Sequence, residues 1–328
     1  MIAYTKRTKK YSKVSKSLTK LNAMVGMSDV KEAVAEQLQF LITNDGNTDG
    51  HFLNTVIQGD PGCGKTSVAK ILYEIWSSTG VFEDEDVEFK IMNRSDFVGS
   101  YMGHTANKTR KILHKHSGHV IFIDEAYSLC GSEKDDYGKE CIDELNSFMG
   151  EQLGKTIVII AGYEDSLNKS YFSVNAGLRR RFNWYFTVQK YTSEELYKIF
   201  VKQLREHGWK MGTNCEDLFR EKSKYFKNGG GDTSNVAFKC KLEYCKRNWT
   251  KKTKDKVIGR EDLAAALKKH FKIVGGSLVE KKVKINDHNL SKKNVSGGAL
   301  ESLIQKIKDR IDSKVKGGQL PSSIMHKC

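Results

Sequence analysis

The chain has 328 residues, 38% of them hydrophobic and 29% charged, and a formal net charge of +15. This length is sufficient for two domains with separate cores. The sequence has no apolar run that approaches the length of about 18 residues needed for a membrane-spanning helix. It also has no secretory leader and no C-x-x-C pair among its seven cysteines. We therefore expect an intracellular protein, cytoplasmic or nuclear, that is not secreted, has no membrane span and keeps its thiols reduced.

The positive charge is concentrated at the two ends of the chain. Residues 1–20 contain seven basic and no acidic residues, and residues 275–328 contain eleven basic and five acidic ones, whereas residues 21–274 contain 37 and 35. We expect a basic N-terminal tail over 1–20 and a basic C-terminal extension over 275–328, either solvated or able to bind nucleic acid. The extension also has apolar residues at the spacing of one amphipathic helix, namely Leu300, Leu303, Ile304, Ile307, Ile311 and Val315.

The strongest motif follows an apolar run over residues 52–57. Residues Gly59 to Thr66 read Gly-Asp-Pro-Gly-Cys-Gly-Lys-Thr, which matches the phosphate-loop pattern G-x-x-x-x-G-K-[ST]. In such a loop, successive N–H groups face the phosphates at a helix N-terminus. Lys65 would reach the β- and γ-phosphates, and Thr66 would bind magnesium. The predicted nucleotide-binding residues of this loop are Gly59, Asp60, Pro61, Gly62, Cys63, Gly64, Lys65, Thr66 and Ser67.

A hydrophobic strand that ends in two carboxylates forms the second motif. Residues 119–125 read His-Val-Ile-Phe-Ile-Asp-Glu, which is typical of a Walker B strand. Asp124 would hold the magnesium shell, and Glu125 would polarise the water that attacks the γ-phosphate. A buried strand followed by an acidic helix N-terminus would give the same pattern. Beside a phosphate loop, however, the two motifs predict adjacent parallel strands, with the carboxylates next to the phosphates.

Strand and helix signals alternate up to about residue 190. An amphipathic helix is predicted within residues 21–42, and strands are predicted over 55–58, 87–92, 120–123, 156–161 and 184–188. From about Thr192 the pattern is helical, over 193–207, 215–227, 233–247 and 260–271, with a break at Asn228 to Asp232. We therefore expect an α/β P-loop NTPase domain over 21–190, whose parallel sheet is covered by helices, and a small all-α lid domain over 191–274.

Several segments together resemble the AAA+ ATPases. Besides the phosphate loop and the Walker B strand, they are residues 97–105 (F-V-G-S-Y-M-G-H-T), 161–163 (A-G-Y) and 175–182 (N-A-G-L-R-R-R-F). Within the AAA+ ATPases, the sequence is most similar to the family of red-type Rubisco activases and stage V sporulation K proteins, and it is also similar to AAA ATPases of large DNA viruses. The resemblance covers roughly residues 21–272 and does not explain the two ends.

The resemblance implies a ring-forming motor, usually hexameric, whose nucleotide sites lie between subunits. Val25 and Gly26 would flank the adenine. Arg181, with Arg179 in support, would be the arginine finger that reaches the neighbouring subunit's site, a contact worth about 10³ to 10⁵ in rate in GTPases. A solvated basic turn is the alternative interpretation of these arginines.

Tyr101, Met102 and Gly103 match the aromatic-hydrophobic-Gly pore loop with which related motors grip an extended polypeptide. An aromatic ring beside a methionine gives a grip that tolerates many sequences, because it needs only apolar contact. A Tyr101 packed into the core is the alternative, and the flanking glycines favour a mobile loop.

Two positions depart from the AAA+ pattern. Ala161-Gly162-Tyr163 stands where a polar sensor, often Thr-Asn, follows the fourth strand, so Tyr163 is the candidate sensor. In the lid, Gly231-Asp232-Thr233-Ser234 stands in place of the Gly-Asn-x-Arg pattern that carries the second sensor. Either this cation is missing, or Lys239 supplies it.

These features together predict an ATP-binding and ATP-hydrolysing motor that uses ATP and Mg²⁺, assembles with itself and remodels or threads a protein substrate. A nucleic-acid-dependent motor or loader is the alternative, motivated by the basic ends. A nucleotide-dependent scaffold that hydrolyses poorly is a third possibility, motivated by the missing sensor arginine. The sequence does not identify the substrate.

Overall fold

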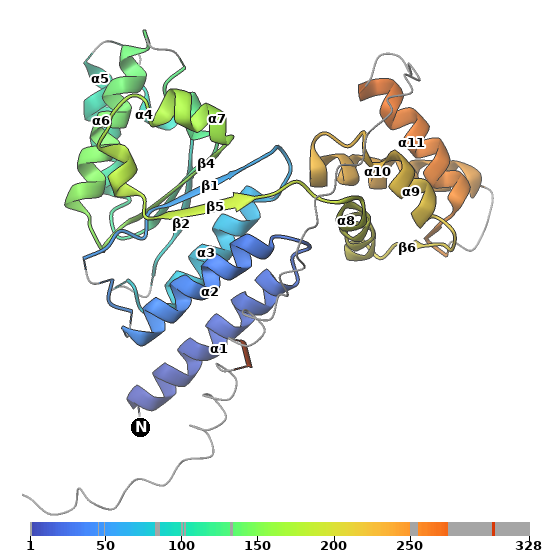
Figure 1. Ribbon diagram of the computed structural model, residues 1–328, viewed down its shortest axis with the longest axis horizontal. Coiled ribbons are helices and arrows are strands. Elements are labelled where there is room, and N and C mark those ends of the chain that lie inside the picture. The colour runs from blue at the N-terminus through green and yellow to red at the C-terminus, as the bar shows by residue number, and fades with distance from the viewer. Residues whose placement is uncertain are drawn as a thin grey trace, which may run out of the picture. The chain divides into compact units, whose positions relative to one another are not determined.

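The computed structural model describes residues 2–44, 46–48, 50–82, 86–99, 101, 103–131, 134–249, 255–274 and 304–305 (Figure 1). The chain forms two compact units. One comprises Met1–Gln58, Thr66–Thr187 and Ser296–Cys328, and the other comprises Gly59–Lys65 and Val188–Val295. Among the described residues we find no helix with the length and apolarity that spanning a bilayer requires.

A five-stranded sheet with strand order β2-β3-β4-β1-β5 forms the centre of the first unit. The strands are β1 (Thr55–Gly59), β2 (Phe89–Met92), β3 (Val120–Ile123), β4 (Ile157–Gly162) and β5 (Trp184–Val188). The pairs β2–β3, β3–β4 and β4–β1 are parallel. Strands β3 and β4 are buried at every residue and are rich in β-branched side chains, as expected for strands covered on both faces.

Helices cover both faces of this sheet (Figure 1). On one face, α5 (His104–Lys115) and α6 (Asp136–Glu151) share a buried apolar cluster with β3 and β4. On the other, α2 (Ser28–Thr43) and α3 (Lys65–Thr79) are joined by a hydrogen bond from Trp76 Nε1 to Gln37 Oε1 (2.9 Å). Shorter helical segments of this unit are α4 (Arg94–Phe97), η1 (Ala126–Leu129), α7 (Glu164–Ser166), η2 (Leu167–Tyr171) and η3 (Leu178–Arg181). The predicted α/β fold, with a parallel sheet between helices, is confirmed.

The basic N-terminal segment forms helix α1 (Ile2–Asn22), in place of the expected solvated tail. Lys20 forms a salt bridge with Glu74 of α3 (2.7 Å). The second half of α1 buries an apolar stripe at helical spacing, formed by Val14, Leu18 and Leu21. The expectation of a solvated segment is therefore wrong for residues 12–20, because three apolar residues on one helix face outweigh the basic composition of the surrounding sequence.

The amphipathic helix predicted for residues 300–315 lies almost entirely outside the described residues. Ile304 and Gln305 are helical, and Ile304 is buried. The rest of the C-terminal extension beyond residue 274 is likewise outside the described residues.

Four helices make up most of the described part of the second unit. They are α8 (Ser193–Glu206), α9 (Glu216–Ser223), α10 (Gly229–Arg247) and α11 (Arg260–Val274). These helices enclose their own core, in which Phe200 and Phe219 stack with ring centroids 4.8 Å apart. The unit also contains a parallel pair of short strands, β6 (Lys210–Met211) and β7 (Val257–Ile258). The all-α expectation missed this pair, because strands of two residues are too short to show a periodicity.

Helix α10 begins inside the glycine-rich segment that the sequence analysis interprets as a break. Its first residue is Gly229. In the first turn, the buried Asp232 carboxylate accepts hydrogen bonds from the backbone N–H (2.8 Å) and the side-chain amide (3.2 Å) of Asn228. This contact closes the turn, so the glycines become helical although their propensity is low.

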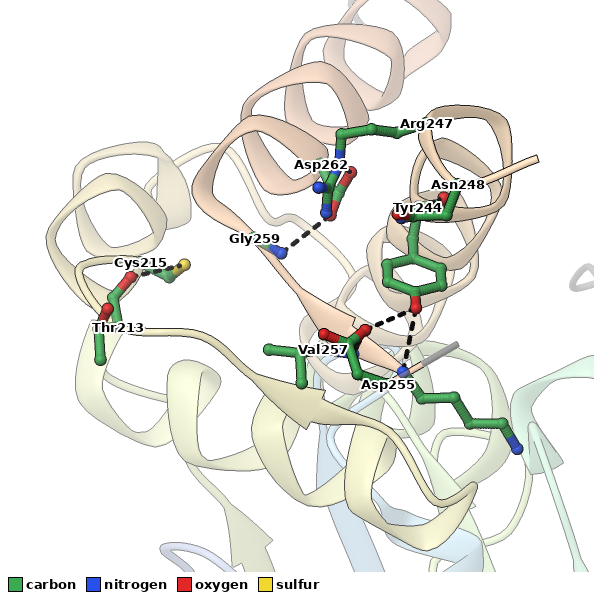
Figure 2. A network of polar contacts seen from close by, with 10 residues as sticks. Thr213, Cys215, Tyr244, Arg247, Asn248, Asp255, Val257, Gly259 and Asp262 are labelled. Carbon is green, nitrogen blue, oxygen red and sulfur yellow. Dashed lines mark hydrogen bonds and ion pairs between the residues drawn. The ribbon is translucent and has the colours of Figure 1, made fainter. Parts of the chain in front are cut away.

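A polar network joins the end of α10 to β7 and the start of α11 (Figure 2). The Arg247 guanidinium donates two hydrogen bonds to the Asp262 carboxylate (2.9 and 2.7 Å), which also accepts the Gly259 N–H (2.9 Å). Nearby, the Tyr244 hydroxyl donates to Asp255 (2.6 Å). Asp262 is 2% exposed, so its buried charge depends on these donors.

We expect Asp262→Ala to lower the free energy of unfolding of the second unit by about 2–3 kcal/mol, because Arg247 and the Gly259 N–H lose their acceptor. Asp217→Ala is the matched control: Asp217 pairs with Arg260 at 2.7 Å, but its side chain is 67% exposed, so the expected loss is much smaller than that of Asp262→Ala. Native-state hydrogen exchange of α10 and α11 measures both losses. Equal losses in the two variants would contradict the importance of burial.

Candidate functional site

The phosphate loop, Gly59–Lys65, belongs to the second unit and folds around the Lys65 ammonium group. Lys65 is 9% exposed, and its Nζ donates to the backbone carbonyls of Gly59 (2.9 Å) and Asp60 (3.0 Å). Helix α3 begins at Lys65, so the loop leads into a helix N-terminus, where the dipole favours anions. The geometry is compatible with the phosphate-binding role that the motif predicts.

Two glycines of the loop allow close backbone packing. Gly62 has φ +66°, and a Cβ there would lie 2.1 Å from the Asn228 carbonyl oxygen. A Cβ at Gly59 would lie 2.6 Å from the Val188 carbonyl oxygen. Only glycine permits such approaches, so these two positions have a structural requirement besides any contact with phosphate.

Other residues of the second unit donate hydrogen bonds to two carbonyl groups of the loop. The Tyr191 hydroxyl donates to the Cys63 carbonyl (2.6 Å), and the Gly230 N–H donates to the Gly62 carbonyl (2.9 Å). The Cys63 thiol is buried, and this burial raises its pKa despite the nearby Lys65 charge. A buried thiol with a raised pKa is a weak nucleophile, which agrees with Cys63 being a small residue at a variable loop position.

A cleft of about 420 Å³ opens beside the phosphate loop, within the same unit. Tyr191, Leu196 and Phe226 form its apolar part, and Lys224 and Lys227 add positive charge. Its volume is typical of sites for small ligands. These residues are separated by up to 36 positions and no local pattern connects them, so they could not be predicted from the sequence.

In the first unit, the two predicted magnesium ligands are in contact. Thr66 Oγ1 donates to Asp124 Oδ2 (3.1 Å). The other oxygen, Asp124 Oδ1, accepts the Glu125 N–H (3.0 Å). Asp124 follows β3, and Thr66 lies in the first turn of α3. The structure therefore brings together two oxygen groups of the kind that Mg²⁺ prefers.

The strands that carry the two motifs are not adjacent, contrary to the prediction. Strand β4 lies between β1 and β3, and it pairs Gly162 with Gln58 of β1 and Ile160 with Ile123 of β3. A later strand can insert between two earlier ones when helical crossovers run over the sheet faces, and sequence spacing does not encode that order. As a consequence, Tyr163, which follows β4, comes from the strand between the two motif strands.

Glu125 is hydrogen-bonded to Tyr127. The Tyr127 hydroxyl donates to Glu125 Oε2, and its ring stacks on Tyr163, with centroids 5.5 Å apart and planes at 30°. Burial, together with the Glu125 carboxylate, raises the pKa of Tyr127, so the hydroxyl remains a donor. Glu125 has φ +50°, a left-handed conformation that is uncommon outside glycine and concentrated at functional sites. Tyr163 was predicted as a candidate sensor, whereas Tyr127 was not predicted from the sequence.

The three arginines of η3 differ in their surroundings. Arg181 is half-buried, its Nε donates to Asn146 Oδ1 (3.4 Å), and its guanidinium lies 5.4 Å from the centroid of the Phe52 ring. Arg179 and Arg180 are exposed. Arg181 would have to leave these partners to reach a second subunit, so its role as an arginine finger stays a prediction.

The Tyr101 side chain is on the surface. It is 69% exposed, and its ring meets the His104 ring edge to face, with centroids 5.6 Å apart. Gly103 precedes α5 with φ +78°, and Met102 lies outside the described residues. The alternative of a core-packed Tyr101 is therefore wrong, and an exposed ring before a left-handed glycine is compatible with the predicted pore loop.

Val25 and Gly26, the predicted adenine neighbours, lie in the turn between α1 and α2. Gly26 has φ +69°, and Lys31 closes the turn by donating to the Met24 carbonyl (2.7 Å). The contact of Val25 and Gly26 with adenine stays a prediction.

The lid position that would carry the second sensor contains no arginine. Asp232 binds Asn228, as described above, and Ser234 is exposed. Lys239 Nζ lies 3.3 Å from His270 Nδ1 of α11, and burial lowers the pKa of both side chains. Lys239 thus contacts the interior of its own unit in this structure.

The sheet order, the loop around Lys65 and the Thr66–Asp124 contact define a P-loop nucleoside triphosphatase. Residues 55–189 match the sequence model of the ATPase family associated with various cellular activities (AAA). The chain belongs to this AAA family of ATPases, in the group with CfxQ-like proteins, stage V sporulation protein K and Rubisco activase. The resemblance inferred from the motifs is therefore confirmed.

Three relatives illustrate this placement. A CfxQ-like protein of Acanthamoeba polyphaga mimivirus is 35% identical over 236 residues, which cover 70% of this chain and 58% of the relative. Stage V sporulation protein K of Bacillus subtilis (strain 168) is 32% identical over 203 residues (60% and 62%). The chloroplastic ribulose bisphosphate carboxylase/oxygenase activase of Cyanidioschyzon merolae is 30% identical over 269 residues (76% and 86%). The match thus spans less than two thirds of the length of the first two relatives.

The fold is also similar to a solved structure of RuvB from Thermotoga maritima. The TM-score is 0.52 at 15% sequence identity, over 77% of this chain and 72% of that one. At this identity the likeness shows a common fold and carries no conclusion about function.

Proposed function

We propose that this chain is a Mg²⁺-dependent ATPase that assembles with itself and remodels or partly threads a protein substrate. The observation that carries the proposal is the Thr66–Asp124 contact with Glu125 as the next residue. It supports one site that holds the metal and supplies a base for in-line attack on the γ-phosphate.

The residues at this position fit magnesium. Mg²⁺ in nucleotide sites is usually held by one or two protein oxygens and by phosphates, and it keeps several waters. Thr66 would bind the ion directly, and Asp124 would hold it through water. When bound, the ion would neutralise charge on the β- and γ-phosphates.

The nucleotide itself would bind at the phosphate loop. Lys65 and the N–H groups of the phosphate loop would bind the phosphates. The cleft bounded by Tyr191 and Phe226 offers aromatic surface for a base, and Lys224 and Lys227 complement an anionic ligand. Val25 and Gly26 remain candidates for the adenine contact.

Two observations support a protein as substrate. Tyr101 presents an exposed ring before Gly103, which suits apolar contact with an extended polypeptide. One relative is named as an activase of the enzyme ribulose bisphosphate carboxylase/oxygenase, so the named target of that relative is a protein. Self-assembly would let Arg181 complete the site of a neighbouring subunit.

Steady-state ATPase activity tests the proposal. We expect turnover with Mg²⁺ and none after chelation of the metal. Single- or double-stranded nucleic acid at moderate salt should stimulate turnover by no more than twofold, which corresponds to a change of about 0.4 kcal/mol in the barrier. Absence of Mg²⁺-dependent turnover would contradict the proposal and favour the weakly hydrolysing scaffold. Strong stimulation by nucleic acid would instead favour a nucleic-acid-dependent motor, the function that the basic ends suggest.

A further inference from the structure

The side chain of Glu125 is exposed, yet one specific donor binds its carboxylate. An exposed glutamate without a partner samples several rotamers, and ordering it costs conformational free energy. The hydrogen bond from the Tyr127 hydroxyl to Glu125 Oε2 selects one arrangement. The Glu125 backbone is also fixed, because its carbonyl accepts the Ser128 N–H (2.7 Å) at the start of η1.

Tyr127 is itself held in place. Its ring stacks on Tyr163, and a Cβ at Gly162 would lie only 2.9 Å from Tyr127 Cδ1. The tyrosine ring therefore lies directly against the end of β4, in space that the missing side chain of Gly162 leaves open. A donor whose own position is fixed can orient its acceptor accurately.

The contacts of Tyr127 connect the ends of two neighbouring strands. Glu125 follows β3, and Tyr163 follows β4, the strand between β3 and β1. The contacts of Tyr127 with Glu125 and Tyr163 therefore link the carboxylate that follows β3 to the end of β4. Strand β1 pairs with the other edge of β4, and the polypeptide continues from β1 through the phosphate loop to Thr66.

We propose that Tyr127 is a positioning residue. It orients the Glu125 carboxylate for contact with the water that attacks the γ-phosphate. This inference rests on the proposed function, because Tyr127 would act only through Glu125. No bond is made or broken at Tyr127, and its hydroxyl keeps its proton while Glu125 accepts the proton of the attacking water. Loss of the hydroxyl should slow hydrolysis and leave nucleotide binding intact.

Tyr127→Phe tests the inference, because it removes the hydroxyl and keeps the ring that stacks on Tyr163. We expect kcat to fall by about ten- to a hundredfold, the range that corresponds to one hydrogen bond to a charged group. The KM for ATP and the equilibrium affinity for ATP should change by less than about twofold. An unchanged kcat would overturn the inference, and so would a raised kcat, which would make Tyr127 a restraint on Glu125.

Tyr73→Phe is a matched control. Tyr73 is also half-buried in the first unit, and its hydroxyl donates to the Val87 carbonyl (2.7 Å). Both variants lose one phenolic hydrogen bond, so their thermal stabilities should fall by similar amounts. If Tyr73→Phe lowered kcat as much as Tyr127→Phe does, the effect would be structural, and the inference would be overturned.

A double-mutant cycle separates action through Glu125 from independent action. In the Glu125→Gln background, Tyr127→Phe should change the residual single-turnover rate by less than about twofold, because residues that act as a unit are not additive. A full additional loss would overturn the inference. Absence of Mg²⁺-dependent turnover in the unsubstituted protein would instead refute the proposed function, so the two failures can be distinguished.

Discussion

Glu125→Gln is expected to retain ATP and to lose nearly all hydrolysis. The substitution keeps the size of the side chain and removes the charge that polarises water, and general-base catalysis typically contributes about 10² to 10⁴ in rate. The Thr66–Asp124 contact does not involve the Glu125 side chain, so the metal ligands remain. Single-turnover hydrolysis and equilibrium binding of labelled ATP measure the two effects separately.

Glu36→Gln controls for the chemical change itself. Glu36 is exposed on α2, and the same isosteric substitution there should leave turnover unchanged. Full hydrolysis by Glu125→Gln would exclude Glu125 as the base. Loss of ATP binding in that variant would show that the substitution disturbs the Thr66–Asp124 contact.

Arg181→Ala is expected to lower turnover by about 10³ or more if Arg181 stabilises the transferred phosphoryl group in a neighbouring subunit. Its guanidinium packs closely against Gly150 of the same unit, since a Cβ at Gly150 would lie 2.9 Å from Arg181 Nη2. The substitution therefore also removes contacts within the subunit, including the hydrogen bond to Asn146. Asn146→Ala removes that partner and keeps the arginine, so it should cost stability without a comparable loss of turnover.

Mixing of variants tests whether Arg181 acts between subunits. An Arg181→Ala subunit keeps its own Glu125, and a Glu125→Gln subunit keeps its arginine. We expect a mixture of these two inactive proteins to regain turnover at mixed sites. No recovery from two folded, co-assembling variants would refute the role of Arg181. A loss seen only in Arg180→Ala, at an exposed position, would move the assignment to that residue.

The local motifs were predictable because each is contiguous in the chain. Gly59 to Thr66 and Asp124–Glu125 carry their chemistry in neighbouring residues, and the runs 120–123 and 184–188 coincide with β3 and β5. Apolar runs bounded by glycine and polar residues are enough to locate buried strands of this length. The AAA family could be identified from the same short segments.

Predictions were wrong where they relied on the composition of a segment and the structure depends on its packing contacts. The basic residues of α1 suggested a solvated tail, but the stripe that includes Leu18 is buried. The glycines before Asp232 suggested a break, but the Asp232 carboxylate binds Asn228 and makes them helical. In both cases a few long-range or capping contacts outweigh the average preference of the segment.

The sequence by itself determined the family, the phosphate loop and the Walker B carboxylates, because these depend on residues that are adjacent along the chain. Only the tertiary structure decided that β4 lies between β1 and β3, and that Tyr127 bridges Glu125 and Tyr163. Tyr127 and Tyr163 are 36 positions apart. Strand order and side-chain contacts between strands follow from how the chain crosses over and packs, and no local pattern of residues records that outcome.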